Sequence, residues 1–303
     1  MHKFSIFKNR FRFLLLPGIV ILCGIIFYFV NSGFNFDVEF SGGTRLHIAM
    51  EQEFNNEEVA QLIKDKTGVS AVVQKTGDGT EAIIKFKEVG DETIEANIFN
   101  ALKEQYGLQG NEPLQIGTQS PSFGKNMQKV SFLAAFWAVI LMLIYITIRF
   151  EWRSAIVAVG TLASNILVMI SFYVIFKLPV NSSFIAAILT ILGYSINDII
   201  VVFDRIRENK GLKANKKLDI PVVVENSVWQ SLTRSINTSV TTLITIVLLY
   251  ILGVPSIQEF ALPIIIGILI GTYSSIFIAA PIWAWWKNSS IQSKKKRARA
   301  AKA

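Results

Sequence analysis

The sequence predicts an α-helical polytopic membrane protein with six transmembrane helices. It also predicts a small α+β domain, of ferredoxin-like βαββαβ order, between helices 1 and 2. Hydrophobic residues make up 51% of the 303 residues, and the mean hydropathy is +0.45, more than a soluble core requires. Apolar runs approach the length of about 20 residues that crosses a bilayer. One long acidic segment separates the first of these runs from the others.

The division into domains follows these runs. Residues 1–30 contain a basic N-terminus and helix 1, and residues 31–125 the extracytoplasmic domain. Residues 126–286 contain helices 2 to 6, and residues 287–303 form a basic cytoplasmic tail, of which Lys294 to Ala303 is expected to be unstructured. The first apolar run, Phe13 to Val30, has no small-residue cleavage site after it. We therefore interpret it as an uncleaved transmembrane helix rather than a signal peptide.

Charge is divided between these parts. Residues 31–125 hold 15 acidic and 8 basic residues, a net charge of −7, whereas the remainder of the chain carries +15. Basic residues gather at the N-terminus, after the second and fourth helices, and in the tail. Because cytoplasmic loops are rich in Lys and Arg, both termini are predicted to be cytoplasmic. The same distribution indicates contact with membrane lipid and not with nucleic acid.

The extracytoplasmic segment shows the periodicities of an α+β domain. We expect strands at 44–50, 71–75, 81–87 and 114–118. Two helices are expected to start at the capping residues Asn55 and Asp91. Gly77-Asp78-Gly79 predicts a turn between the two middle strands. The order is therefore βαββαβ, and His47 is expected to be a strand residue without chemistry.

The five later spans are bounded by charged or turn-forming residues. Arg149 to Arg153, with an interfacial Trp, marks a cytoplasmic turn. Asp219-Ile220-Pro221 marks a helix start, and the amphipathic segment 222–233 is expected to lead from the interface into the fifth span. The expected spans are 130–148, 155–176, 183–203, a fifth ending near 252, and 260–286.

The fourth span carries the candidate functional residues. Asp198 lies inside its apolar run, about 9 Å before Asp204 near the helix end. A carboxylate in hydrocarbon costs roughly 2.5 to 3.5 kcal/mol, and such residues are functional by default. Tyr194, Asn197 and Asp198 share one helix face with Thr190. We therefore predict an ion or proton relay at Asp198, with Asn197 beside it and Tyr194 in support.

Neighbouring spans offer further polar residues. Arg234 on the fifth span lies within reach of the inner half of the bilayer, either facing Asp198 or snorkelling to the interface. Thr238 and Thr241 extend the same stripe, and Asn165 on the third span adds a buried polar group. An Asp–Arg pair would attract while the carboxylate is ionised and release on protonation. In the sixth span, Gly267, Gly271 and Ser275 have the spacing of a helix-packing stripe.

Several classes of function are excluded. The chain has two histidines and one cysteine, Cys23, so no metal site and no disulfide framework is expected. It has no phosphate-binding GxxxxGK[ST] loop. No Ser/His or paired-Asp arrangement indicates an enzyme. We therefore expect no catalytic residues, no metal and no cofactor.

Four stretches resemble the SecF proteins of the SecD/SecF family, a branch of the resistance-nodulation-division superfamily. Phe36 to Thr44 (FDVEFSGGT) resembles the start of their outer domain, and Tyr145 to Ser154 (YITIRFEWRS) the turn after their second helix. Thr190 to Asn209 (TILGYSINDIIVVFDRIREN) is very similar to their fourth-helix signature. Arg234 to Ser239 (RSINTS) matches their fifth-helix signature. The similarity covers nearly the whole chain.

The resemblance implies a subunit of the protein-export machinery of the bacterial cytoplasmic membrane. Such a subunit would pair with SecD, associate with the SecYEG channel, and use the proton motive force to assist a translocating preprotein. In the family, the residues matching Asp198 and Arg234 are implicated in proton passage. One carboxylate can also serve sodium, so proton and sodium coupling both stay open.

One stretch departs from the family pattern. Before the second span the family has a Val-Gly-Pro-x-Val/Ile-Gly run, whereas this chain has Gln119 to Gly124 (QSPSFG) and lacks the first Gly. A hinge there is open to question. The Gly42-Gly43 pair is interpreted as a tight turn that needs positive φ.

Two alternatives are weighed against coupled protein export. A half-size resistance-nodulation-division exporter of small molecules or lipids would have a much longer outer segment than the one at 31–125. A structural scaffold of the translocon would have no need of Asp198.

Overall fold

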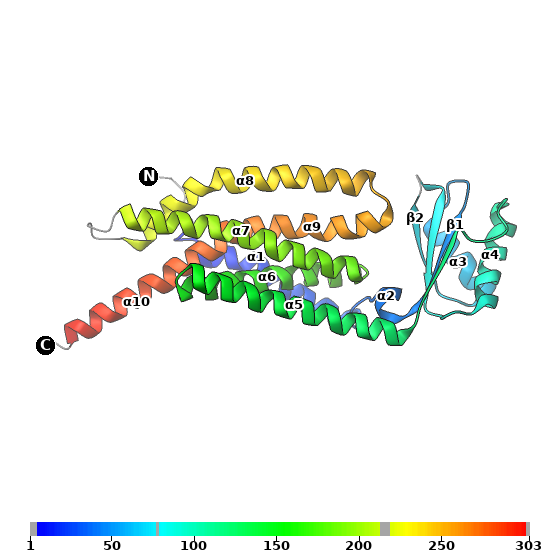
Figure 1. Cartoon of the computed structure of the whole chain (residues 1–303), viewed down its shortest axis with the longest axis horizontal. Coiled ribbons are helices and arrows are strands. Elements are labelled where there is room, and N and C mark those ends of the chain that lie inside the picture. Colours follow the sequence, from blue (N-terminus) through cyan, green and yellow to red (C-terminus); the bar gives the residue numbers. More distant parts are fainter. Residues whose placement is uncertain (1–4, 77–78, 213–218, 301–303) are drawn as a thin grey trace.

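The computed structural model describes residues 5–76, 79–212 and 219–300 and has two parts, a long helical bundle and a sheet domain at one end of it (Figure 1). Among the described residues, six helical segments are long and apolar enough to cross a membrane, so the six expected spans are confirmed. The bundle helices are α1 (Arg10–Val30), α5 (Pro121–Arg149), α6 (Trp152–Ile175), α7 (Ser182–Leu212), α8 (Ile220–Leu252), and α9 (Pro255–Ser274), which continues through the π-helical turn η2 (Ser275–Ala279) into α10 (Ala280–Ala300).

The sheet domain has the expected βαββαβ order. Its strands form one antiparallel sheet in the order β2-β3-β1-β4, and Asn55 and Asp91 cap its two main helices with their side chains. The elements are α2 (Val38–Ser41), β1 (Gly43–Ala49), α3 (Asn56–Thr67), β2 (Val72–Thr76), β3 (Glu81–Phe86), α4 (Glu92–Tyr106) and β4 (Gln115–Gln119).

One face of the sheet forms the core of this domain. Leu46 and Ile84 are paired across β1 and β3 and pack with Ile63 of α3 and Ile98 of α4. Since successive strand residues point to opposite faces, the other face is turned away from α3 and α4. His47 lies on that other face, where its Nε2 is 2.7 Å from a carboxylate oxygen of Glu81.

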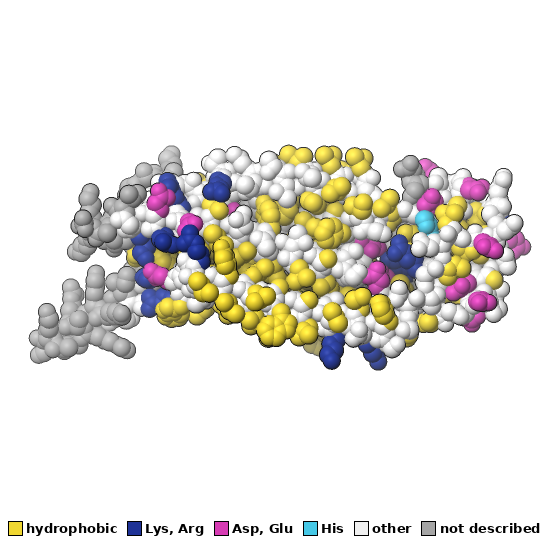
Figure 2. All heavy atoms as spheres, viewed as in Figure 1, with side chains coloured by type: hydrophobic (Ala, Val, Ile, Leu, Met, Phe, Trp, Pro, Cys, Tyr) yellow, Lys and Arg dark blue, Asp and Glu magenta, His cyan; other side chains and the backbone are white. Residues whose placement is uncertain are grey.

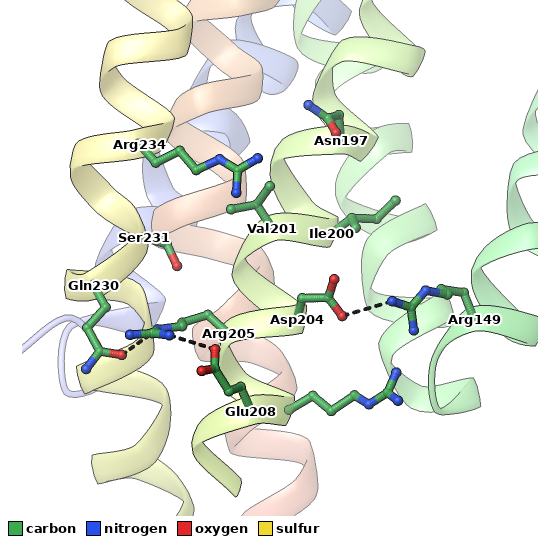
Figure 3. A pocket seen from close by; sticks show the side chains of 11 residues that line it. Arg149, Asn197, Ile200, Val201, Asp204, Arg205, Glu208, Gln230, Ser231 and Arg234 are labelled. Carbon is green, nitrogen blue, oxygen red and sulfur yellow. Dashed lines mark hydrogen bonds and ion pairs between the residues drawn. The ribbon is translucent and has the colours of Figure 1, made fainter. Parts of the chain in front are cut away.

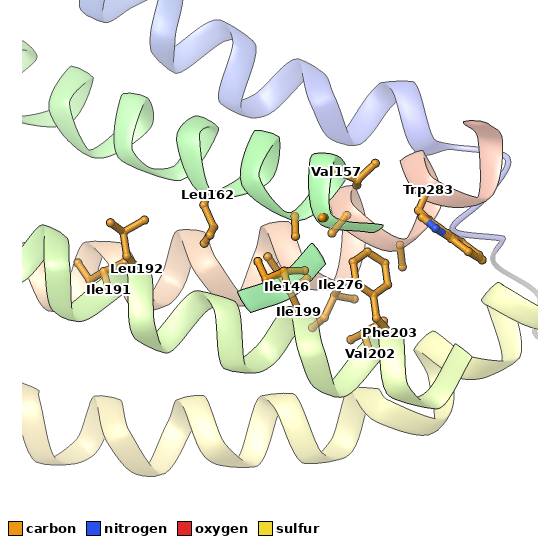
Figure 4. Close-up of a cluster of buried hydrophobic side chains, with 14 of the residues drawn as sticks. Ile146, Val157, Leu162, Ile191, Leu192, Ile199, Val202, Phe203, Ile276 and Trp283 are labelled. Atoms are coloured by element: carbon orange, nitrogen blue, oxygen red, sulfur yellow. The ribbon is translucent and has the colours of Figure 1, made fainter. Parts of the chain in front are cut away.

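The bundle is organised around α6, α7 and α9. About half of the apolar window of each of these helices is buried inside the structure, compared with 11% for α1, α5 and α8. Figure 4 shows the central cluster, in which side chains of α6, α7 and the α9–α10 segment interdigitate. Gly267 packs against Ile191 and Gly271 against Ser195, so the small-residue stripe does bring α9 close to α7.

Charged and apolar side chains are distributed over the surface as in a membrane-spanning protein. Figure 2 shows Lys and Arg gathered at the end of the bundle away from the sheet, an apolar band along the helices, and Asp and Glu over the sheet domain. The two chain ends also lie at the end of the bundle opposite the sheet (Figure 1). The chain is a multi-pass membrane protein.

Some boundaries differ from expectation. Helix α5 starts at Pro121, with Ser120 as its capping residue, because Pro fits the first helical turn. Segment 222–233 is continuous with the fifth span within α8, and the tail expected to be unstructured continues α10 to Ala300. The turn at Gly77-Asp78 and the basic loop residues 213–218 lie outside the described residues.

The link between sheet and bundle depends on glycines. Gly42 and Gly43 have φ of 81° and 146°, which L side chains rarely adopt. A Cβ on Gly43 would lie 2.3 Å from the backbone oxygen of Phe86. Gly124 of α5 is as close to α2, since its Cβ would lie 2.5 Å from the backbone oxygen of Phe40. The stretch that departs from the family pattern is therefore a tight contact in this chain.

We expect Gly124→Ala to lower the melting temperature of the purified protein in detergent. The added methyl group forces α5 and α2 apart, and overpacking of this kind costs about 1–3 kcal/mol. Gly160→Ala on α6 is the matched control, because a Cβ there meets nothing within 4 Å. Equal melting temperatures for the two variants would show that this contact is not tight.

Glu95 on α4 gives a prediction about pH. The Glu95 side chain is buried, and burial, followed by the charges of Glu92 and Asp91, raises its pKa. A carboxyl whose pKa is raised by folding stabilises the fold below its unfolded pKa, and this stabilisation is lost as pH rises through the folded pKa. Stability therefore falls above about pH 4.5, the ordinary value.

We expect Glu95→Gln to remove this loss and to raise the melting temperature near neutral pH. The measurement compares thermal unfolding of the full chain at about pH 5 and about pH 8. Glu104→Gln, an exposed position on the same helix, should leave the pH dependence as it is. A pH dependence that Glu95→Gln does not alter would exclude this role for burial.

Candidate functional site

A buried carboxylate lies between three helices in the bundle. Asp198 of α7 is only 6% exposed. Ser235 of α8 donates a hydrogen bond to its Oδ1 at 2.6 Å, and Ser275, the first residue of η2, donates to its Oδ2 at 2.6 Å. Both serines are fully buried. A buried charge needs such donors, because otherwise its desolvation is not offset.

The Ser275 hydroxyl has two possible acceptors. Its Oγ lies 2.6 Å from Asp198 and 3.0 Å from the backbone oxygen of Thr272. A hydroxyl has one hydrogen to donate and can also accept. Ser275 can therefore donate to an ionised carboxylate, or accept from a protonated one while donating to Thr272. It begins a π-helical turn, a feature frequent at functional sites.

A second polar layer lies one helical turn closer to the sheet domain. The Tyr194 hydroxyl donates to Ser239 Oγ at 3.1 Å, and Ser239 Oγ lies 2.6 Å from Thr272 Oγ1. These residues come from α7, α8 and α9, the helices that also build the Asp198 layer. The predicted supporting residue Tyr194 is therefore part of a polar chain between the same helices.

Arg234 does not pair with Asp198, so the ion pair considered from the sequence is not formed. Consecutive helix residues do not face the same way. Since Ser235 points at Asp198, Arg234 is turned outward, and Asn197 is turned outward for the same reason beside Asp198. Among the described residues no cation forms an ion pair with the Asp198 carboxylate.

Arg234 and Asn197 instead line a pocket of about 780 Å³ at the end of the bundle away from the sheet. Figure 3 shows the Arg234 side chain extended from α8 toward α7, between Asn197 and Val201. Two ion pairs lie in the same pocket, nearer the end of the bundle: Arg149–Asp204 at 3.5 Å and Arg205–Glu208 at 2.6 Å. Asn197, which lines this pocket, is the residue directly before Asp198 in α7.

The other predicted polar residues lie apart from the carboxylate. Thr238 and Thr241 are exposed and bond to carbonyls of their own helix α8. Asn165 of α6 is buried, and its Nδ2 has no partner in the described part of the chain. It lines a cavity of about 10 Å³ together with Ser195, whose hydroxyl is likewise unpartnered there.

The described residues contain no group of three or more His, Cys, Asp or Glu side chains that could hold a metal ion. The chemistry that the site can perform is therefore proton or ion binding by one carboxylate, with hydroxyls as donors and acceptors.

Comparison with known proteins identifies the family. The model for "Protein export membrane protein SecD/SecF, C-terminal" matches residues 101–289, which is more than half of the chain and includes the buried carboxylate. The chain belongs to the SecD/SecF family. It is an accessory subunit of the Sec protein-export machinery.

Individual relatives agree with this assignment. The chain is 35% identical over 282 residues to the protein translocase subunit SecF of Dictyoglomus turgidum, covering 92% of this chain and 95% of that one. It is 35% identical to the subunit SecDF of Bacillus subtilis, covering 96% of this chain and 39% of that one. The chain thus spans almost all of a separate SecF and about two fifths of a fused SecDF.

Solved SecDF structures have the same fold. The crystal structure of SecDF from Thermus thermophilus, described as a translocon-associated membrane protein, superposes with a TM-score of 0.80 at 29% identity. The match covers 95% of this chain and 39% of that one. A second SecDF, in a "super-membrane-facing form", gives a TM-score of 0.69.

The sequence reasoning missed the two serines that hold Asp198. Ser235 lies inside the family signature after Arg234, and Ser275 lies in the small-residue stripe that was interpreted as packing only. A signal was present, because a buried carboxylate requires donors and short hydroxyl side chains are the ones that fit between closely packed helices. The π-helical turn that aims Ser275 has no pattern in the sequence.

We expect Ser235→Ala and Ser275→Ala each to destabilise the protein, since a hydrogen bond to a charged group contributes about 1.5–3 kcal/mol. The measurement is thermal unfolding in detergent. Thr245→Ala is the control, because this exposed hydroxyl on α8 bonds only to its own helix at Thr241. Serine variants no less stable than the control would contradict the assigned hydrogen bonds.

Proposed function

We propose that the chain is the SecF subunit of a bacterial Sec protein translocase, without enzymatic activity of its own. It would pair with a SecD subunit in the cytoplasmic membrane, with both termini in the cytoplasm, and assist preproteins through SecYEG by using the proton motive force. The observation that carries the proposal is the buried Asp198 carboxylate, held by Ser235 and Ser275 from two other helices.

The hydroxyl at Ser275 explains how Asp198 could change its charge while buried. In the ionised state both serines donate to the carboxylate. When a proton arrives at Oδ2, Ser275 turns its hydrogen to the Thr272 carbonyl and accepts from Asp198. Each state keeps its hydrogen bonds, so neither carries the cost of an unpaired buried group. Protonation of Asp198 thus changes the hydrogen bond, and with it the attraction, between α7 and the α9–η2 segment.

The geometry favours a proton over a sodium ion. Both carboxylate oxygens already have a hydroxyl at 2.6 Å, and the serines come from helices packed on either side. A metal cation requires several oxygen ligands arranged around it, whereas a proton needs one acceptor atom. We therefore propose that this protein is coupled to protons rather than to sodium ions.

The face that carries Arg234, Asn197, Thr238 and Thr241 would meet SecD. These side chains are exposed on α7 and α8 although they lie on membrane spans. Polar side chains within a membrane face protein or a water-filled cavity and not lipid. The match covers 39% of the fused SecDF relatives, and in the proposed complex the SecD part of such a protein would cover this face. Arg234 would then act at the pocket between the two subunits.

We expect Asp198→Asn to abolish proton-dependent export while leaving insertion intact. Asn cannot ionise but has nearly the same shape, so the fold is kept and only the titration is removed. The measurement is preprotein export in cells depleted of the native protein, with membrane abundance determined in parallel. Asp65→Asn on α3 is the matched control, because Asp65 is exposed and accepts a hydrogen bond only from Gln61 of the same helix.

The two possible results are distinct. Loss of export at normal abundance in Asp198→Asn, with Asp65→Asn active, supports coupling at the buried carboxylate. Normal export in Asp198→Asn would assign that residue to helix packing and the coupling to the partner subunit.

A further inference from the structure

A buried ion cluster joins the sheet domain to the bundle. Lys85 of β3 lies on the sheet face away from α3 and α4, and its side chain is only 4% exposed. Its Nζ donates to Asp37 Oδ2 at 2.8 Å and to Glu259 Oε1 at 3.0 Å. Asp37 precedes α2, whereas Glu259 is in the first turns of α9. One lysine from the sheet is thus bound to both the linker and a membrane helix.

The carboxylates of this cluster are held from the bundle side as well. Asn181, at the start of α7, donates to Glu259 Oε2 at 2.6 Å and accepts from the backbone N–H of Phe184. Asp37 Oδ1 accepts from the N–H of Val38, and the backbone N–H of Asp37 donates to Val180. Both acidic side chains therefore have fixed positions, and Lys85 is the member that comes from the sheet.

Two pockets flank this ion cluster. A pocket of about 340 Å³ lies on one side, between β2 and the outer ends of α6 and α9, and includes Glu259 in its lining. Another of about 440 Å³ lies on the other side and includes Asp37 and Lys85. The Lys85–Glu259 ion pair is thus a buried charged contact between the sheet and α9, with a hollow beside it.

Helix α9 connects this cluster to the candidate site. Glu259 lies near its outer end, and Ser275, which bonds Asp198, follows directly on its inner end. Sixteen residues separate the two, about 24 Å at 1.5 Å per residue. The same helix thus bonds the intramembrane carboxylate at one end and the extracytoplasmic sheet at the other.

We propose that Lys85, Asp37 and Glu259 form the joint by which α9 positions the extracytoplasmic domain, so that movement of α9 at Ser275 displaces the sheet. Docking through the cluster follows from the contacts alone. The use of that joint in export rests on the function proposed above. Removing one partner leaves a buried charge unpaired, which is strongly destabilising for the contact.

The test measures docking directly in the full-length chain. Cysteines replace Gln74 of β2 and Gln258 of α9, which line the same pocket, in a Cys23→Ser background. A short thiol-specific cross-linker is applied to membranes, and the cross-linked fraction reports how often the sheet is seated on α9. No export is needed for this readout, so its result is independent of whether the chain is proton-coupled.

We expect Lys85→Met to reduce the cross-linked fraction several-fold. Glu259→Gln should do the same, and since Glu259 lies outside the sheet domain, this variant leaves the domain fold intact. Lys66→Met is the control, because Lys66 forms an exposed ion pair within the same domain. Unchanged cross-linking in both Lys85→Met and Glu259→Gln would overturn the proposed joint.

Preprotein export by the same variants tests whether the joint transmits movement from α9 to the sheet. Loss of export together with loss of cross-linking, in variants that keep Asp198, supports a joint that carries movement. Export that persists in undocked variants would overturn this part. If Asp198→Asn exports normally while Lys85→Met still undocks the sheet, the proposed coupling fails and the joint stands.

Discussion

The structure depends on the placement of one carboxylate in an apolar bundle. An ionised Asp within a membrane costs roughly 2.5 to 3.5 kcal/mol, and Asp198 is offset by two serine hydroxyls that must come within 2.6 Å of it. Serine is short, so α8 and the α9–η2 segment have to approach α7 closely. Gly271, against Ser195, provides that approach on α9. The hydrogen bonds to Asp198 therefore require the same close packing of helices that the small residues of α9 allow.

The same requirement explains the exposed polar face of α8. A helix that aims Ser235 at Asp198 turns Arg234 and Thr238 toward the outside, and these residues bond only within their own helix or line the open pocket. The chain thus has a hydrogen-bonded carboxylate in its interior and polar side chains exposed on its membrane-spanning surface. Pairing with a second subunit follows from this asymmetry, and not only from the existence of fused relatives.

Much of this could be predicted from the sequence, because hydropathy defines spans and a charge within a span is conspicuous. Asp198, Tyr194 and the βαββαβ order were found in this way. The partner of Asp198 was not, since the choice between Arg234 and Ser235 is a rotation of one residue, about 100° of helix. A small error in the predicted rotation of the helix is enough to select the wrong residue. Ser275 depends on a π-helical turn and Lys85 on a contact between domains, and neither has a local pattern.

The two helices that hold Asp198 have different outer ends. Helix α8 ends at Leu252, which is 80% exposed, and its Tyr250 lines the pocket that Gln74 of β2 also lines. Helix α9 ends beside Glu259 and its bond to Lys85. Both helices contact Asp198, and among the described residues it is α9, through Glu259 and Lys85, that forms an ion pair with the sheet domain. In the function proposed above, a movement that begins at Asp198 would therefore reach the sheet domain along α9.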